Sequence, residues 1–524
     1  MNIWDFLTIG LYLAGLLIMG VILRHQADKK DYFLAGRSLG WKPLSLSIMA
    51  TQLSAISFVS APAFVGLREG GGLVWLSYEL ALPLAMLFLL WKILPSLHRA
   101  GVVSVYDYLE QRFNLHTRVL LSFVFQISRS FATAIMIYAV SVILQGAIGL
   151  AFWQSIVAIG LITVVYSLQG GMKAVVYGDA LQMVLIVLGT IVCLAYGLYH
   201  IGGLEQFWSW LEPGRMQTLR FDAYGFDGQG FGFWPMLFGG IILYASYYGC
   251  DQSEAQRALS AKNTIDLKKM IFAASILRFP ITLLYCGAGL IIGTFALNTP
   301  EFLDKIPEGK PDWMMPVFIV NYMPNGVIGL LIVAILAAAM SSLSSAINSL
   351  SAVSVEDYCR LTKQSLSNSQ YLLRARFVGI AWGLVTLLLS FFAGDIAPTV
   401  IEAINKVGSL FYGPILACFF LGLSTQSVMG KHVNLGLIAG VLTNMVFWLF
   451  VDGVFWFWWN VIGFVVTTTV SLALSRLLAT KALPEPQIVN EYSAKSGNDL
   501  NRIDIAILLA WFIVILSVCI LLGG

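Results

Sequence analysis

Apolar residues run along this chain in long stretches that short polar breaks separate. A helix needs about 20 apolar residues to cross the roughly 30 Å hydrocarbon core of a bilayer. Stretches of that length recur about fourteen times, and the pattern therefore predicts about fourteen transmembrane helices. They are expected near residues 3–24, 43–66, 73–95, 119–148, 152–168, 175–198, 233–255, 271–298, 325–354, 377–394, 399–423, 433–451, 455–478 and 505–522.

The composition agrees with this pattern. Of the 524 residues, 58% are hydrophobic and 11% are charged, and the mean hydropathy is +0.81. Soluble domains carry about 25% charged residues, so the chain is predicted to be an all-α polytopic membrane protein. No loop is long enough for a separate domain, and the phosphate-binding motif G-x-x-x-x-G-K-[ST] is missing. We therefore expect neither an enzyme nor an ATP-driven pump, no organic cofactor and no nucleic-acid partner.

The basic residues predict the orientation, because cytoplasmic loops carry an excess of Lys and Arg. Most of the 31 basic residues fall in one set of alternate loops. That set includes Arg257, Lys262, Lys268 and Lys269 between the seventh and eighth spans. The opposite set holds only Arg68, Arg215, Arg220, Lys305 and Lys310. Both termini are therefore expected on the outer face of a cell (inner) membrane.

Polar and small residues interrupt two of the predicted spans. The first interruption covers residues 50–57 (ATQLSAIS), and the second covers residues 244–252 (YASYYGCDQ). They lie five spans apart, and an odd offset inverts the direction of the chain in the membrane. Interrupted helices at matching positions of two inverted halves are typical of the central site of a transporter. The alternative is small-residue helix packing together with one functional kink.

A third polar stretch, residues 337–349, is rich in serine (AAAMSSLSSAINS). Ser341 and Ser345 lie four residues apart and share a helix face, while Ser344 lies on an adjacent one. Hydroxyl oxygens at this spacing, together with carbonyls of an unwound neighbour, can coordinate a small hard cation such as Na⁺. The alternative is a serine-alanine face that allows two helices to approach closely.

Charged residues inside the predicted spans are candidates for function, because each is costly to bury. Asp179 is either a functional carboxylate or the acid at a helix start near the inner interface. Glu79 either contacts a substrate or lies at the membrane edge. Arg129 either holds a carboxylate-bearing solute or binds backbone carbonyls.

Three further charged residues lie in spans nearer the C-terminus. Glu402 and Lys406 are four residues apart and are predicted to pair with each other. Arg278 precedes Phe279-Pro280, and the sequence indicates no partner for it.

The chain resembles the sodium:solute symporter family, which contains the sodium/glucose, proline, pantothenate and sialic acid transporters. Three segments carry the resemblance: residues 31–38 (DYFLAGRS), residues 166–174 (YSLQGGMKA) with a glycine pair expected to form an inner turn, and the serine stretch. The resemblance implies a LeuT-type five-plus-five inverted repeat with extra flanking helices. The expected parts are an N-terminal helix and inner loop (1–42), a first half (43–198), an outer loop (199–232), a second half (233–423) and C-terminal helices (424–524).

The resemblance also implies candidate sites. A first Na⁺ would be held by the carbonyls or hydroxyls of Ala50, Leu53, Ala338, Ser341 and Ser342. Some relatives, similar to the sialic acid transporter, have a second Na⁺ site, and its residues match Ser341, Ser344, Ser345 and Asp179. The substrate candidates are Gln52, Ser54, Ser57, Tyr78, Glu79 and Arg129. Two departures argue against sialic acid: a Gln stands where the sialic acid transporters have Thr, and Arg129 lies about one turn before their carboxylate-binding arginine.

The hypothesis is therefore a sodium-coupled symporter that imports a small polar organic solute by alternating access, with one or two Na⁺ and one chain as the functional unit. The solute classes left open are a sugar, a sialic acid, a carboxylate, an amino acid and a vitamin. A proton-coupled carrier that uses Asp179 or Glu79 is the first alternative, and a nutrient receptor or channel is the second.

Overall fold

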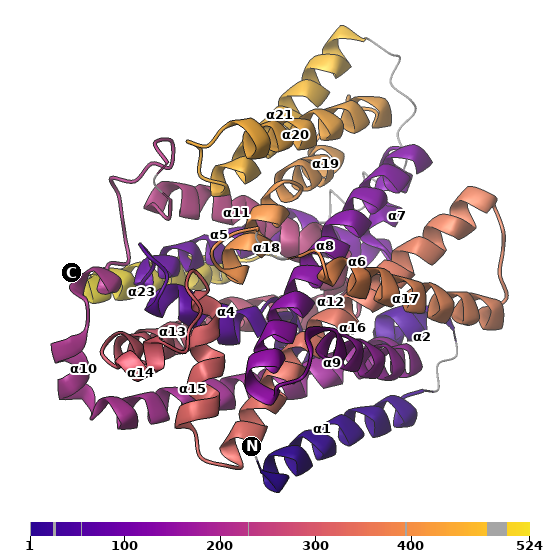
Figure 1. The fold of residues 1–524 in the computed structure, drawn as a ribbon. Coiled ribbons are helices and arrows are strands. Elements are labelled where there is room, and N and C mark those ends of the chain that lie inside the picture. The colour runs from indigo at the N-terminus through magenta and orange to yellow at the C-terminus, as the bar shows by residue number, and fades with distance from the viewer. Residues whose placement is uncertain are drawn as a thin grey trace.

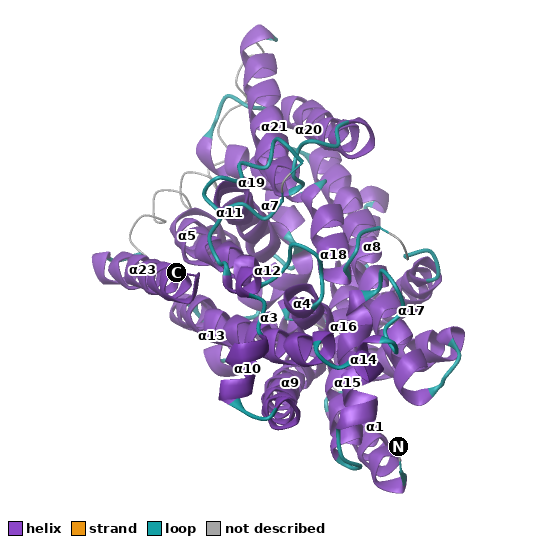
Figure 2. Cartoon of the chain, turned by 60° about the vertical axis from the view of Figure 1, so that its left-hand side comes forward, coloured by secondary structure: helices purple, strands orange, loops and turns teal. Residues whose placement is uncertain are grey.

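The computed structural model describes residues 2–24, 28–53, 55–228, 230–393, 396–478 and 500–523. Within these ranges the chain is a bundle of helices without strands, and one isolated β-bridge joins Leu39 to Ala261 (Figure 1 and Figure 2). The α-helices are α1 (Ile3–Ile22), α2 (Lys29–Leu34), α3 (Trp41–Gln52), α4 (Ala55–Gly66), α5 (Ala81–Phe88), α6 (Leu94–Ala100), α7 (Val105–Arg112), α8 (Leu115–Ile148), α9 (Phe152–Ile201), α10 (Leu204–Trp210), α11 (Phe233–Cys250), α12 (Gln252–Leu259), α13 (Thr264–Leu297), α14 (Pro300–Leu303), α15 (Met314–Tyr322), α16 (Val327–Thr362), α17 (Asn368–Ser390), α18 (Val400–Ser409), α19 (Tyr412–Ser424), α20 (Gly430–Phe450), α21 (Phe457–Leu477) and α23 (Arg502–Gly523). Short helical turns are η1 (Ala35–Arg37), η2 (Leu73–Leu80), η3 (Leu89–Ile93), η4 (Pro213–Met216) and η5 (Pro311–Trp313).

In the described part of the chain, 10 helices are long and apolar enough to cross a membrane, and two bent helix pairs raise this number to 12. The sequence predicted about fourteen spans, so two predicted spans do not meet the length and composition of a membrane-crossing helix. One is the region 152–168, whose apolar helix Phe152–Val165 is short. The other is the region 233–255, where α11 carries three tyrosines and a tryptophan that reduce its apolar character.

Both predicted interruptions coincide with helix breaks. α3 ends at Gln52, α4 begins at Ala55, and the two helices are bent by 50°. α11 ends at Cys250, and Asp251 has extended backbone before α12 begins. A third bend, of 41°, separates α18 from α19.

The glycine pair of the second motif also breaks a helix. Gly171 has φ 56° within α9, so α9 consists of two helices that meet there. A side chain at this position would lie 2.7 Å from the Tyr32 carbonyl oxygen. Glycine is therefore required for both the positive φ and the close contact with α2.

The helices differ strongly in how much of their surface other helices cover. The apolar window of α16 is 89% buried, whereas those of α1 and α23 are each 17% buried. α1 and α23 lie at the edges of the bundle (Figure 1). The serine stretch is therefore in the protein interior, and the outer helices offer apolar side chains to lipid.

Candidate functional site

The first predicted sodium site lies where α3 packs against α16. The Leu53 amide at the end of α3 donates to the Met49 carbonyl (2.7 Å), and the carbonyls of the last helical turn, including that of Ala50, lie at an open helix end. On α16, the Ser342 hydroxyl donates to the Ala338 carbonyl at 3.4 Å. The five predicted ligands are all fully buried: Ala50, Leu53, Ala338, Ser341 and Ser342. This set of uncharged oxygen donors fits a hard monovalent cation.

The residues predicted for a second Na⁺ surround an arginine. The Asp179 carboxylate on α9 accepts hydrogen bonds from Ser341 Oγ (2.8 Å) and from Arg257 Nη2 on α12 (2.5 Å). The same Nη2 atom donates to Ser345 Oγ at 2.5 Å. Ser344 instead donates to the Ser341 carbonyl of its own helix at 3.0 Å. Arg257, which the sequence placed among the basic residues of an inner loop, is only 1% exposed.

A cavity of about 70 Å³ lies beside the first break, between α3, α4, η2, α8, α11, α13, α18 and α19. The predicted substrate residues that line it are Gln52, Ser57, Tyr78 and Arg129. Ser54 lies outside the described residues, and Glu79 is buried but does not line the cavity. Polar and aromatic lining residues that the sequence did not predict to bind the substrate are Trp75, Tyr247, Arg278, Tyr285, Asn405 and Tyr412.

Arg129 enters this cavity from α8 with part of its hydrogen-bonding capacity unused. Its Nη1 lies 3.9 Å from Asp251 Oδ2 at the second break. Its Nε and Nη2 atoms are buried and have no hydrogen-bond partner in the described part of the chain. Burying an N–H without an acceptor is costly, so these donors favour an acceptor group that enters the cavity.

A second arginine, Arg278 of α13, lines the same cavity. The sequence indicated no partner for it, but its Nε donates to Glu79 Oε2 at 3.1 Å. Tyr244 OH donates to the other oxygen of Glu79, also at 3.1 Å. Glu79 is fully buried in an ion pair, a role that neither of the two alternatives from the sequence included. Arg278 Nη1 is buried and lacks a partner among the described residues.

Two tyrosines of α11 connect the second broken helix to η2 and to the end of α3 at the cavity. Tyr78 stacks on Tyr244 of α11, with 4.3 Å between the ring centroids and 8° between the ring planes. Tyr248 of α11 donates a hydrogen bond to Gln52 Oε1 at the end of α3. This hydrogen bond joins the two breaks directly.

An ion pair joins α18 to the chain just after α4. Arg68 binds the Glu402 carboxylate with two nitrogens, Nη2 at 2.9 Å and Nε at 3.3 Å. The predicted pair between Glu402 and Lys406 is wrong, since Lys406 Nζ instead lies 5.3 Å from the ring centroid of Trp448. Thr399 Oγ1 donates to Glu402 at 2.6 Å and holds it at the start of α18, where the planar guanidinium can match both carboxylate oxygens.

Asp312, in the turn η5, holds the start of α18 by accepting a hydrogen bond from the Val400 amide at 2.9 Å. Removal from water raises the pKa of Asp312 to about 6, although hydrogen bonds from Ser60 and Val400 oppose the shift. Because the folded pKa exceeds the unfolded one, the stabilising contribution of the protonated form is complete below the unfolded pKa and is lost as pH rises through about 6.

We therefore expect the melting temperature to change differently in the native protein and in Asp312→Asn when the pH is raised from 5 to 7. The native protein should lose on the order of 1 °C more than the variant. Thermal unfolding in detergent at both pH values measures this difference. Equal pH dependence of the two proteins would contradict the assignment of this titration to Asp312.

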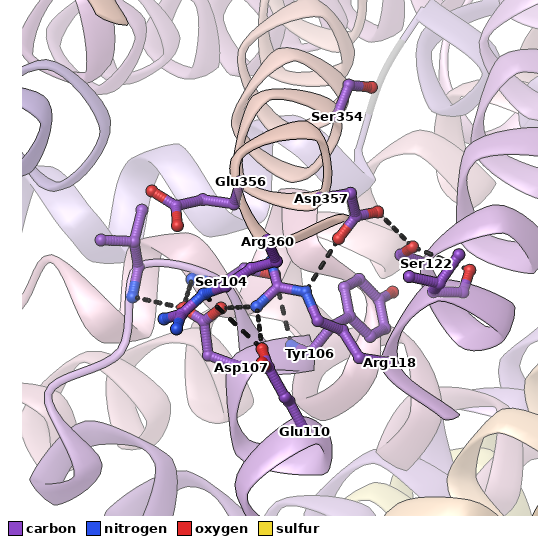
Figure 3. Close-up of polar contacts among 12 residues, drawn as sticks. Ser104, Tyr106, Asp107, Glu110, Arg118, Ser122, Ser354, Glu356, Asp357 and Arg360 are labelled. Atoms are coloured by element: carbon purple, nitrogen blue, oxygen red, sulfur yellow. Dashed lines mark hydrogen bonds and ion pairs between the residues drawn. The ribbon is translucent and has the colours of Figure 1, made fainter. Parts of the chain in front are cut away.

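A buried ion network lies near the C-terminal end of α16 (Figure 3). Arg118, which is fully buried, binds Asp107, Glu110 (3.0 Å) and Asp357 (2.8 Å). Ser122 donates to the second oxygen of Asp357. Since these residues belong to α7, α8 and α16, the network fixes α16 against its neighbours far from the serine stretch.

Two interrupted helices that meet at a buried cavity, with a serine-rich helix beside one break, define a secondary transporter of the LeuT type. Residues 32–440 match the sodium:solute symporter family, and the chain belongs to this family. It is a multi-pass membrane protein that couples the movement of Na⁺ to that of a small solute, and it is not an enzyme. The family membership and the fold class that the motifs predicted are confirmed.

Several curated proteins are similar over most of the chain. Sodium-coupled monocarboxylate transporter 2 of Danio rerio is 29% identical over 81% of this chain and 67% of its own length. The human sodium/iodide cotransporter is 27% identical, covering 84% of this chain and 69% of that protein. A putative sodium-dependent multivitamin transporter of Drosophila melanogaster is 28% identical, covering 85% and 74%.

Among solved structures, a Na⁺-coupled sialic acid symporter in a substrate-bound outward-open state has the same fold. The TM-score is 0.83 at 24% identity, over 92% of this chain and 100% of the other. The likeness establishes the fold.

Proposed function

We propose that this chain moves Na⁺ together with a small organic anion, whose carboxylate binds Arg129 at the central cavity. The observation that carries the proposal is the pair of cavity-lining arginines, Arg129 and Arg278, which both bury N–H groups without acceptors in the described part of the chain. Arg278 is neutralised by Glu79. Arg129 Nη1 lies 3.9 Å from Asp251 Oδ2, and the Nε and Nη2 atoms of Arg129 have no acceptor among the described residues, so Arg129 is the better partner for an incoming negative charge.

The rest of the cavity supports a small solute with an apolar body. Its other lining residues include Ile56, Trp75, Met136, Leu243 and Ile404. One water needs about 10–15 Å³ of such volume, so about 70 Å³ corresponds to a solute of a few non-hydrogen atoms. Relatives named for monocarboxylates and for iodide, which are anions, are consistent with this class.

The proposed sodium site couples to the solute through the first break. Na⁺ would be held by the carbonyls of Ala50, Leu53 and Ala338 and by the hydroxyls of Ser341 and Ser342. These ligands join α3 to α16, and Gln52, the last residue of α3, lines the solute cavity. Ordering this helix end with Na⁺ therefore preorganises the solute site. Linked sites of this kind typically couple by about 1–3 kcal/mol.

We further propose that a single chain is the functional unit, that the protein resides in the cell (inner) membrane, and that both termini face outward. The excess of Lys and Arg in one set of loops supports this orientation. Labelling of single cysteines placed near each terminus tests the orientation.

Uptake into proteoliposomes tests the solute class. Short monocarboxylates should enter when an inward Na⁺ gradient is imposed and should not enter with K⁺ in its place. Each acid is paired with its neutral amide, which has nearly the same shape, and glucose serves as an uncharged polar control. Na⁺-driven uptake of the amides or of glucose, without uptake of the acids, would overturn the anion assignment. Uptake driven by a pH gradient without Na⁺ would favour proton coupling.

A further inference from the structure

The Arg257 guanidinium, only 1% exposed, is held by three helices in addition to its contact within α12. Besides Asp179 and Ser345, its Nε lies 2.7 Å from Ser47 Oγ of α3. Its Nη1 donates to the Ser253 carbonyl, one turn earlier on α12. The guanidinium thus connects α12, which follows the second break, to α3, α9 and α16.

Both carboxylate oxygens of Asp179 are already engaged by donors. Asp179 Oδ1 accepts from Ser341 Oγ at 2.8 Å, and Oδ2 accepts from both Ser47 Oγ (2.6 Å) and Arg257 Nη2. Asp179 and Arg257 cancel each other's charge in a place from which water is excluded. A sodium ion here would need the same carboxylate oxygens and would lie beside a guanidinium of like charge. These residues therefore do not fit a second Na⁺.

We infer that Arg257 is a tethered cation that takes the place of a second Na⁺, so that the protein binds one Na⁺ in each transport cycle. The guanidinium supplies the positive charge that Asp179 requires and joins the helices that an ion bound to Asp179 and the serines would join. Because it is covalently part of α12, it cannot leave with the solute. The inference rests on the proposed first sodium site, which supplies the one ion that is counted.

Counting bound ²²Na⁺ on the purified full-length protein tests the inference without knowledge of the solute. The native protein is expected to bind one Na⁺ at saturation, and Asp179→Asn is also expected to bind one, because Asp179 is not a ligand of the bound ion. Arg257→Gln frees the Asp179 carboxylate and is expected to bind two. Adding Asp179→Asn to that variant returns the number to one.

Two control variants separate charge from general damage. Arg257→Lys keeps a positive charge opposite Asp179 and should still bind one Na⁺. Arg112→Gln removes a different arginine, which donates to the Gly422 carbonyl at 3.0 Å, and should also bind one.

The outcomes distinguish the two proposals. Two ions on the native protein, reduced to one by Asp179→Asn, would overturn the tethered cation and leave the first site intact. A folded Arg257→Gln variant that binds a single ion would overturn it as well. If that variant does not fold, the count on the native protein decides. A native protein that binds no Na⁺ would instead refute the proposed first site.

Discussion

Replacing Arg129 with glutamine is expected to weaken binding of a small monocarboxylate by about tenfold to a hundredfold. The buried Nε and Nη2 donors of Arg129 have no acceptor within the described ranges of the chain, and they are available to an anion in the cavity. The charge of Arg278, the other arginine there, is already balanced by Glu79. A hydrogen bond to a charged group contributes about 1.5–3 kcal/mol, which corresponds to this range of affinity. The measurement is the concentration dependence of Na⁺-driven uptake into proteoliposomes.

Arg220→Gln provides the matched control for this prediction. Arg220 lies in the loop between η4 and α11, donates to Gln217 at 3.0 Å and does not line the cavity. The Arg220→Gln substitution should leave solute affinity unchanged. Binding of ²²Na⁺ in the absence of solute should also survive in Arg129→Gln, which excludes a collapsed protein. Unchanged monocarboxylate affinity in Arg129→Gln would rule out Arg129 as the anion-binding group.

The second large effect is expected at the sodium site, where Ser342→Ala should raise the Na⁺ concentration for half-maximal uptake by about tenfold or more. The substitution removes one of the two proposed hydroxyl ligands, and contacts with a charged partner contribute about 1.5–3 kcal/mol. Solute affinity should fall in parallel at low Na⁺ and recover at saturating Na⁺, because linkage between the two sites is reciprocal.

Ser349→Ala is the control within the same helix. Ser349 is equally buried, and its hydroxyl donates to the Ala346 carbonyl at 3.0 Å, two helical turns from Ser342. The Na⁺ dependence of uptake by the Ser349→Ala variant should match that of the native protein. If Ser342→Ala leaves both the Na⁺ dependence and the solute affinity unchanged, the sodium site has been assigned to the wrong residues.

The features that sequence reasoning found are those that local pattern determines. Four polar residues within residues 50–57 are incompatible with a continuous lipid-facing helix, and the structure breaks the helix there. The glycine pair before Met172 predicted a turn for a similar reason, because Gly171 takes a backbone conformation that other residues avoid.

Pairings between distant parts of the chain were beyond the reach of local pattern. Arg257 belongs to a polar stretch that resembles an inner loop, yet the stretch folds into the buried helix α12 and brings the guanidinium to Asp179, 78 residues away. Glu79 and Arg278 are 199 residues apart. The spacing of Glu402 and Lys406 suggested a helical pair, but a two-pronged contact with Arg68 formed instead. A spacing rule describes which partners are near in one helix and cannot describe partners that tertiary packing provides.

The arginine at Asp179 has a consequence for the energetics of transport. One Na⁺ moving with one monovalent anion carries no net charge, so the membrane voltage does no work on the transported pair. At equilibrium, the inside-to-outside ratio of solute concentrations could then not exceed the outside-to-inside ratio of Na⁺ concentrations. A second Na⁺ would add about 2.3 kcal/mol of driving force for each 100 mV of membrane potential, which corresponds to a solute ratio about fiftyfold larger. The limiting solute ratio would also depend on the square of the Na⁺ concentration ratio. A carrier with a fixed guanidinium in place of that ion would work against shallower solute gradients and would leave the membrane potential undisturbed.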